Sequence, residues 1–149
     1  MRYGHREVCL DHETGRRHPE SPDRIRAVRR ALADHHGVTY AEGGLAAVEN
    51  VLAVHDGDYV DDLREFCADG GGNWDADTVA VEETFEASLA SAGLAEWAVT
   101  AALDGASGRK TPFSLGRPPG HHAVGDDAMG FCFFNNAAVA AQTALDERA

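Results

Sequence analysis

An alanine-rich segment from Val81 to Leu103 carries small side chains on more than one side. Within it Phe85, Leu89 and Ala92 follow one another at steps of three or four residues, which is the spacing of one face of an α-helix. The alanine and serine side chains between them would let a neighbouring element approach closely. The sequence therefore predicts a long helix at this position, with other elements packed tightly around it.

The other periodic segments predict an α/β protein. Ser21 is a suitable N-cap for a helix over residues 21–37, and residues 58–68 repeat the same apolar spacing. A last helix, capped by an asparagine, is expected after residues 133–136, and residues 112–115 predict a short buried strand. Helices that alternate with short strands indicate an α/β layer architecture, although few strands are recognisable.

Length and charge narrow the class of protein. The chain has 149 residues, enough for a single domain with its own core. Acidic residues outnumber basic ones by 25 to 13, which argues against a chain that binds nucleic acid or anionic membranes through general charge attraction. The excess is uneven, because residues 1–36 carry eight basic and six acidic residues, whereas residues 37–149 carry five and nineteen.

The cysteines and the apolar segments bear on the compartment. Cys9, Cys67 and Cys132 are an odd number of widely spaced residues, which fits reduced thiols better than a disulfide framework or a thiolate zinc site. No stretch approaches the roughly twenty apolar residues that a membrane helix needs, and residues 1–5 do not open an apolar signal region. We therefore expect a cytoplasmic protein.

Two adjacent histidines end a proline-rich turn with the sequence Arg117-Pro118-Pro119-Gly120-His121-His122. The prolines fix their φ angles and bias the residues before them toward extended backbone, while the glycine permits a sharp turn. A neutral imidazole accepts and returns a proton near neutral pH. The two histidines are therefore candidates for catalysis, with an ordinary surface pair as the alternative.

This turn and the later segment Met129-Gly130-Phe131-Cys132-Phe133-Phe134-Asn135-Asn136 resemble the active-site signature of the zinc-dependent histone deacetylase family. They are most similar to its class II and prokaryotic branch, which includes acetylpolyamine amidohydrolases and acetoin-utilisation proteins. Residues 18–25, and Val54-His55-Asp56 with Tyr59, resemble N-terminal motifs of the family in the expected order. The resemblance implies an arginase-deacetylase-like α/β fold, a parallel sheet flanked by helices.

The resemblance also implies catalytic roles for the two histidines. His122 matches the general base for the attacking water, which then acts as general acid for the departing amine. His121 matches the neighbour that supplies electrostatic support. The implied substrates are acetylated amines, such as acetyl-lysine or acetylated polyamines. A negatively charged surface suits such cationic molecules.

Four more residues match substrate-binding positions. The carbonyl of Gly130 matches the acceptor for the amide N–H of the substrate, and Phe131 matches a wall of the tunnel around its aliphatic stem. Arg24 matches an arginine near the acetate-release pocket. Asp77 matches a carboxylate on the substrate-rim loop, with Asp75 as a competing assignment.

The zinc ligands of the family are an Asp-x-His pair and a distant second Asp. These ligands and the transition-state tyrosine all match positions beyond residue 149. Zinc is thus the expected cofactor, with no ligands in this sequence. Residues 1–149 are interpreted as the N-terminal part of a single deacetylase-like domain that lacks the C-terminal strands, and the missing half is an expected partner. An open strand edge and uncovered alanine-rich faces would make this chain prone to association.

Two other chemistries fit the sequence less well. The histidines with Asp126 and Asp127, or His5 with His12 and His18, lack the spacing of a known zinc motif. Activation of Cys132 by His122 would need an exposed thiol, whereas the flanking phenylalanines predict a buried one. Two hypotheses remain, one half of a zinc-dependent amidohydrolase or a non-catalytic, partner-binding module of the same fold.

Overall fold

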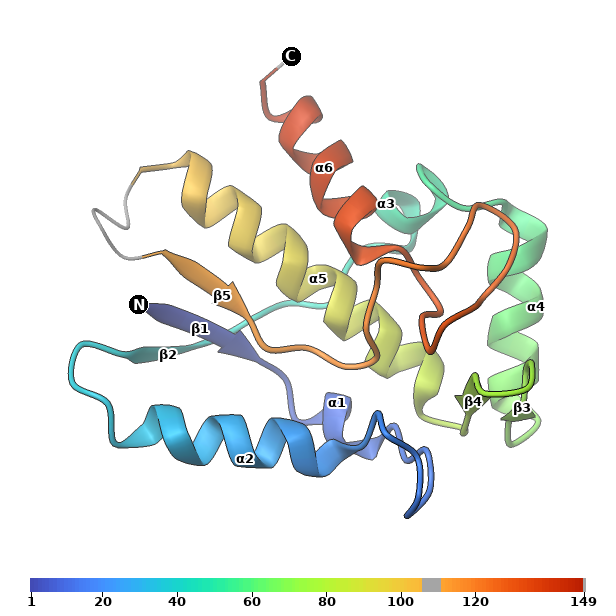
Figure 1. Cartoon of the computed structure of the whole chain (residues 1–149). Helices are drawn as coiled ribbons and strands as arrows, with labels where there is room; N and C mark the ends of the chain where they lie inside the picture. Colours follow the sequence, from blue (N-terminus) through green and yellow to red (C-terminus); the bar gives the residue numbers. More distant parts are fainter. Residues whose placement is uncertain (106–110, 149) are drawn as a thin grey trace.

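The computed structural model describes residues 1–105 and 111–148, which form a parallel sheet flanked by helices (Figure 1). The sheet has the strand order β2-β1-β5, and a separate antiparallel pair joins β3 to β4. The elements in chain order are β1 (Arg2–His5), α1 (Val8–Asp11), α2 (Pro22–Ala33), β2 (Thr39–Glu42), α3 (Val48–Leu52), α4 (Gly57–Ala68), β3 (Gly72–Asn73), β4 (Val79–Ala80), α5 (Thr84–Leu103), β5 (Pro112–Ser114) and α6 (Asn136–Asp146).

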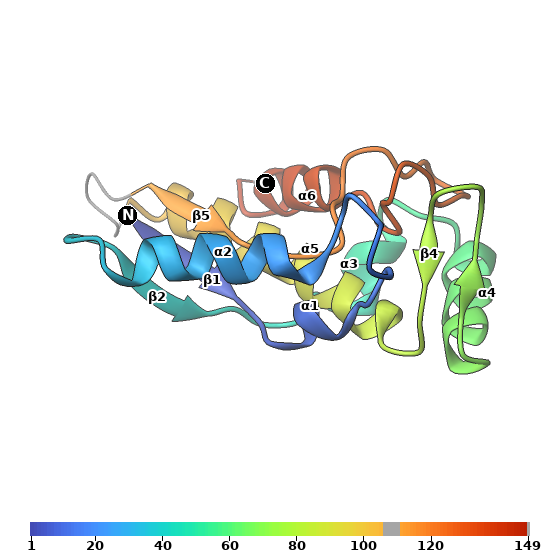
Figure 2. The same ribbon diagram turned by 60° about the horizontal axis from the view of Figure 1, so that its bottom comes forward.

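Helices cover both faces of the central strand β1. Tyr3 packs with Ile25 of α2 and with Leu115 on one face. Gly4 points to the other face, where an added Cβ atom would lie 2.9 Å from the Trp97 ring of α5. Successive residues of a strand face opposite sides of the sheet, so these two neighbours separate α2 from α5. Figure 1 shows this layering, with the strands between α2 and α5, and in Figure 2 α2 lies in front of the strands.

The small residues of α5 are used for close packing, which confirms that prediction. A Cβ atom on Gly93 would lie 2.5 Å from the backbone nitrogen of Ala46, and one on Gly116 would lie 2.5 Å from Ser91 Oγ. The Ser91 hydroxyl also donates a 2.8 Å hydrogen bond to the Pro118 carbonyl. The proline-rich turn therefore lies directly against α5.

The predicted helices form, with shifted ends. Helix α2 ends at Ala33 although its predicted stop is Gly37, and Ser21 stands at its N-cap without a side-chain hydrogen bond. The predicted asparagine cap of α6 is Asn135, whose side chain accepts from the Ala138 N–H at 3.0 Å. Within the described part of the chain, none of the helices has the length and apolar character needed to cross a bilayer.

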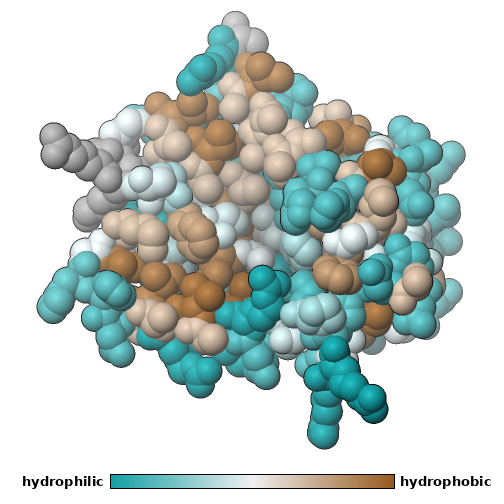
Figure 3. All heavy atoms as spheres, viewed as in Figure 1, coloured by the Kyte–Doolittle hydropathy of each residue, from teal (hydrophilic) through white to brown (hydrophobic). Residues whose placement is uncertain are grey.

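The strand predicted at residues 112–115 forms as β5 over Pro112–Ser114, but the predicted burial is only partly right. Leu115 is buried, whereas Phe113 is 43% exposed. The cause is position, because β5 is an outer strand of the three-stranded sheet and has β1 as a neighbour on one side. On the face of the molecule seen in Figure 3, apolar surface extends over the region of β5, α5 and α6.

A buried ion pair holds the proline-rich turn against the N-terminal loop. Arg117 is 2% exposed, and its Nε and Nη2 atoms donate to the Glu20 carboxylate at 2.7 and 2.6 Å. Its Nη1 atom donates to the carbonyls of Cys9 at 3.0 Å and His12 at 2.7 Å. One guanidinium thus joins chain segments about a hundred residues apart, and both carboxylate oxygens of Glu20 receive a partner.

A buried histidine lies beside this pair. His12 is 1% exposed, and its Nδ1 atom lies 2.8 Å from the Thr84 hydroxyl. That hydroxyl oxygen already accepts from the Val81 N–H at 2.8 Å, so its own hydrogen is free to be donated to His12. The ring proton of His12 then belongs on Nε2, which lies 4.0 Å from Glu20. Burial, reinforced by the charges of Arg117 and His18, lowers the pKa of His12 to about 3.

Removing one partner of the ion pair should destabilise the chain more than removing both charges. Replacement of Arg117 by Met leaves the Glu20 carboxylate buried without its cation, which we expect to cost about 3 to 5 kcal/mol of unfolding free energy. The double variant Arg117→Met with Glu20→Gln should recover much of this loss. Urea unfolding followed by circular dichroism measures both values, and additive losses in the double variant would contradict the proposed coupling.

The neutral His12 predicts a pH dependence of stability. The unfolded chain binds a proton at this residue near pH 6.5 and the folded chain only near pH 3, so the stabilisation is complete above pH 6.5 and decreases as the pH falls toward 3. We expect a slope of roughly 1.4 kcal/mol per pH unit below about pH 6 from this residue. His5 and His55 contribute in the same direction, because burial lowers their pKa values as well.

The measurement is the unfolding free energy of the wild type and of His12→Gln between about pH 5 and pH 7.5. Since the variant keeps every other titrating group, the difference between the two curves isolates His12. Parallel curves would show that His12 does not carry the proton uptake.

Candidate active site

The two adjacent histidines lie side by side at the end of the proline-rich turn. Their ring centroids are 4.3 Å apart, at an interplanar angle of 46°. Both side chains are exposed, and the His121 N–H donates to Cys132 Sγ at 3.4 Å. Behind them, Gly120 has no room for a side chain, because an added Cβ atom would lie 2.1 Å from Asn136 Cγ. The turn thus packs against the start of α6, and both imidazoles point outward.

A cavity of about 730 Å³ opens in front of the two rings. Five of the six residues singled out from the sequence line it, from three separate parts of the chain. Its lining consists of Pro19, Glu20, Arg24, Pro119, His121, His122, Gly130 and Phe131. Imidazoles, a carboxylate, a guanidinium and an aromatic ring therefore meet at one concave surface, which is the arrangement expected of a binding site for a small polar ligand.

The part of the cavity wall beside His122 has a left-handed backbone. Gly130 has a φ of 57°, and an added Cβ atom there would lie 2.9 Å from Cδ2 of the His122 ring. Phe131 also has a positive φ, of 68°, which is uncommon for a residue with a side chain. Its N–H donates to the Thr78 hydroxyl at 3.2 Å. These two residues bring the backbone against His122 and turn the Phe131 ring into the cavity wall.

Arg24 lies near the cavity but in an open environment. Its guanidinium is 3.6 Å from the Glu20 carboxylate, and its side chain is 65% exposed. Glu20 therefore contacts two cations, the buried Arg117 and the exposed Arg24. The second contact is weak, because an exposed ion pair of this kind is worth little. Arg24 keeps a positive charge at the cavity wall.

Asp77 lines a second cavity, of about 690 Å³, beside the first. The two cavities share Pro19 and Phe131. The competing residue, Asp75, is used locally, since its Oδ1 atom accepts from the N–H groups of Asp77 at 2.9 Å and Thr78 at 2.6 Å. Of these two aspartates, Asp77 is thus the one that lines this cavity.

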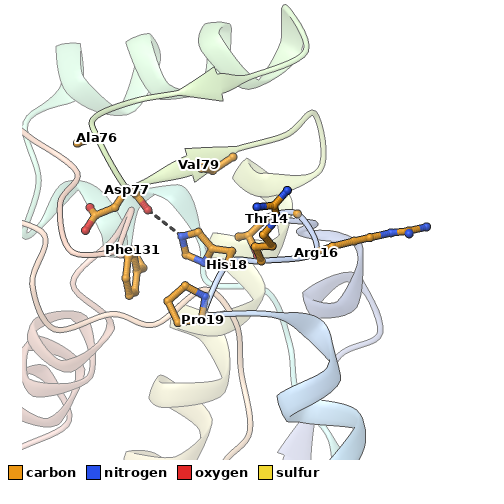
Figure 4. A pocket seen from close by; sticks show the side chains of 10 residues that line it. Thr14, Arg16, His18, Pro19, Ala76, Asp77, Val79 and Phe131 are labelled. Atoms are coloured by element: carbon orange, nitrogen blue, oxygen red, sulfur yellow. Dashed lines mark hydrogen bonds between the residues drawn. The ribbon is translucent and has the colours of Figure 1, made fainter.

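His18 lines the second cavity next to Pro19 and Phe131, a position that was not predicted from the sequence. Its Nε2 atom lies 2.9 Å from the Asp77 carbonyl, and its ring packs edge-on against Phe131 at 4.7 Å. On the other side of the ring, Nδ1 lies 2.9 Å from the Glu20 carbonyl and 3.1 Å from the Glu20 backbone nitrogen, so both ring nitrogens contact backbone groups. Figure 4 shows His18 between Asp77 and Pro19, beside the Phe131 ring.

The motif around His55 supports the loop behind the cavity. The His55 Nε2 atom accepts from the Asn135 N–H at 2.9 Å, and the Tyr59 hydroxyl donates to the Phe133 carbonyl at 2.5 Å. Phe133 and Phe134 are both buried in the core cluster around α4 and α5. These contacts fix the backbone that leads from the histidines to α6.

The residues considered for a separate metal site or for thiol catalysis do not form such a site in the structure. His5, His12 and His18 each contact a separate partner, namely the Leu115 carbonyl, Thr84 and the Asp77 carbonyl. Over residues 1–105 and 111–148, no three histidine, cysteine, aspartate or glutamate side chains gather in a way that could hold a metal ion. The Cys132 thiol is fully buried. These surroundings do not favour a self-contained metal site or a thiol nucleophile.

Known proteins are similar in sequence to this chain. The family model described as histone deacetylase domain matches residues 18–149. The chain is 43% identical over 129 residues to a probable deacetylase of Methanothermobacter thermautotrophicus, a match that covers 85% of the chain and 38% of that protein. It is 38% identical over 131 residues to a histone deacetylase-like amidohydrolase of Pseudomonas aeruginosa, covering 85% and 34%. It is 49% identical over 78 residues to an acetylpolyamine amidohydrolase of Mycoplana ramosa, covering 50% and 21%.

A solved structure agrees with these matches. The crystal structure of the HDA15 HD domain is similar with a TM-score of 0.89 and 33% sequence identity, over 99% of this chain and 44% of that one. The chain therefore spans less than half the length of these relatives. The fold and the sequence matches confirm the resemblance to this family, which includes hydrolytic deacetylases and amidohydrolases. The chain belongs to the histone deacetylase domain family.

Proposed function

We propose that residues 1–149 form the N-terminal half of a zinc-dependent deacetylase that removes acetyl groups from acetyl-lysine or acetylated polyamines. The observation that carries this proposal is the pair of imidazoles 4.3 Å apart that line a cavity together with Gly130 and Phe131. The amidohydrolases and deacetylases among the relatives support it. The described residues supply no ligand set for zinc, so we assign the metal ligands to polypeptide outside residues 1–149.

In this proposal the two histidines carry out the proton transfer from water to the leaving amine. His122 takes a proton from the water whose oxygen bonds to the acetyl carbon, and it returns that proton to the amine nitrogen as the carbon–nitrogen bond breaks. The products are acetate and the free amine. His121, in ring contact with His122, stabilises the charge that develops on its neighbour. Because the turn that carries them packs against α6, the two side chains need little rearrangement for this proton transfer.

The other cavity residues bind the substrate. Gly130 contributes its carbonyl as acceptor for the substrate amide N–H, and Phe131 packs its ring against the methylene stem. Arg24 attracts the acetate product, for which its exposed cation near Glu20 is suitably placed. Asp77 lines the second cavity, and there its carboxylate would orient the part of the substrate that lies outside the first cavity.

A chimera tests the proposal. Residues 1–149 replace the matching N-terminal part of the probable deacetylase of Methanothermobacter thermautotrophicus, and hydrolysis of acetyl-lysine peptides and acetylspermidine is measured with zinc present. We expect turnover. In this chimera His122→Ala should lower kcat at least about a hundredfold with little change in substrate binding, because proton transfer is lost. A folded chimera without activity would favour the alternative, a non-catalytic partner-binding module.

The left-handed Gly130 gives a second prediction for the same chimera. Gly130→Ala would place a methyl group 2.9 Å from the His122 ring, so the ring must move and kcat should fall at least about tenfold. Gly37 is the matched control, since its φ is 78° and nothing lies within 4 Å of an added Cβ atom. Gly37→Ala carries a similar backbone strain without touching a ring. Equal effects of the two substitutions on kcat would show that contact with His122 is not the cause.

A further inference from the structure

The cavity beside the two histidines has a charge that the composition of the chain does not suggest. It is lined by Thr14, Gly15, Arg16, Arg17, His18, Pro19, Ala76, Asp77, Val79 and Phe131. The chain as a whole carries a net charge of −12, yet two adjacent arginines stand at this cavity. Local charge rather than net charge governs what binds at a short distance, because salt screens charges beyond about 8 to 10 Å.

These two arginines differ from most others in the chain. Arg26, Arg29 and Arg64 form ion pairs with nearby carboxylates on the surface. Arg16 and Arg17 are exposed, and within residues 1–105 and 111–148 neither has a hydrogen bond or ion pair of its own. Figure 4 shows Arg16 extended from the loop, away from Asp77. Their guanidinium groups are thus free to pair with a ligand.

Among the described residues, no carboxylate forms an ion pair with Arg16 or Arg17. Glu13 lies on the same loop, where its Oε1 atom accepts from the Gly15 N–H at 3.1 Å. Asp77 belongs to the loop on the other side of His18, and in Figure 4 its carboxylate points away from Arg16. The cavity therefore has an acidic end and a basic end, with the His18 and Phe131 rings between them.

The position of the basic end relates it to the reaction. Phe131 and Pro19 line both cavities, so a substrate whose acetylated side chain passes Phe131 has its remaining part close to Arg16 and Arg17. An arginine pair recognises carboxylate geometry well. Resting on the function proposed above, we propose that Arg16 and Arg17 are specificity-determining residues that select acetylated amines with a carboxylate nearby, such as acetyl-lysine flanked by Glu or Asp. Acetylated polyamines, which have only cationic neighbours, are then poor substrates.

The test compares peptides that differ only in charge. The chimera is assayed on acetyl-lysine peptides with Glu, Gln or Lys as neighbours, placed on the N-terminal or the C-terminal side, and on acetylspermidine. Two exposed ion pairs predict a kcat/KM about fivefold higher for the Glu peptide than for the Gln peptide at low salt, on one side only. The preference should vanish in 1 M salt, where the Debye length is about 3 Å. Equal rates, or a preference for Lys or for acetylspermidine, would overturn the proposal.

Variants of matched charge locate the effect. Arg16→Gln with Arg17→Gln should abolish the preference for Glu and leave the rate on the Gln peptide within about twofold, because only charge recognition is lost. Arg30→Gln with Arg148→Gln removes the same charge at exposed positions away from both cavities, and it should keep the preference. Loss of the preference in the control pair, or its survival in the Arg16 and Arg17 pair, would refute the assignment.

Failure of the proposed function gives a different result from failure of this inference. A chimera that hydrolyses no peptide contradicts the proposed function. The inference is then decided by NMR titration of the 149-residue chain with the Glu and Gln peptides, followed through the side-chain Nε–H signals of Arg16 and Arg17. Shifts with the Glu peptide alone support an anion-binding cavity, and identical spectra with both peptides refute it.

Discussion

The contact between Arg117 and Glu20 determines where the two histidines lie. A guanidinium has five N–H donors in a fixed plane, and here its atoms reach both carboxylate oxygens and two backbone carbonyls. A buried ion pair adds little net stability compared with apolar side chains, but it is satisfied in few arrangements. The turn before His121 therefore has one position relative to the N-terminal loop. That loop contributes Pro19 and Glu20 to the cavity, and the start of α2 that follows it contributes Arg24, so the same contact shapes both sides of the site.

Sequence patterns predicted the parts of this fold that depend on local spacing. The long helix α5 and the Asn135 cap of α6 follow from residues close together in the chain. The central strand β1 was not recognised, because it has only four residues, one of them glycine, and it is covered on both faces. The exposure of Phe113 was also missed, since it depends on the place of β5 in the sheet rather than on the residues of β5.

In the candidate site, too, the residues of short motifs were predicted from the sequence and the long-range contacts were not. His121, His122, Gly130 and Phe131 lie in two short motifs, and the structure brings those motifs together at one cavity. The link between Glu20 and Arg117 joins residues 97 positions apart. The sequence signal for this link was the opposite charge of Glu20 and Arg117, each of which lies in a proline-containing motif. The His18 contact leaves no such signal, because its partner is a backbone carbonyl that every residue possesses.

Phe131 occupies a left-handed backbone position that is held from two sides, by the Thr78 hydroxyl and by the His18 ring. Branched side chains such as valine or isoleucine are strongly disfavoured at a positive φ. The aromatic wall is therefore difficult to exchange without rebuilding its neighbours. Arg16 and Asp77, by contrast, are exposed, and neither has a positive φ. Evolutionary change in substrate preference would then be concentrated in the loops that carry them, while the narrow passage beside the histidines is retained.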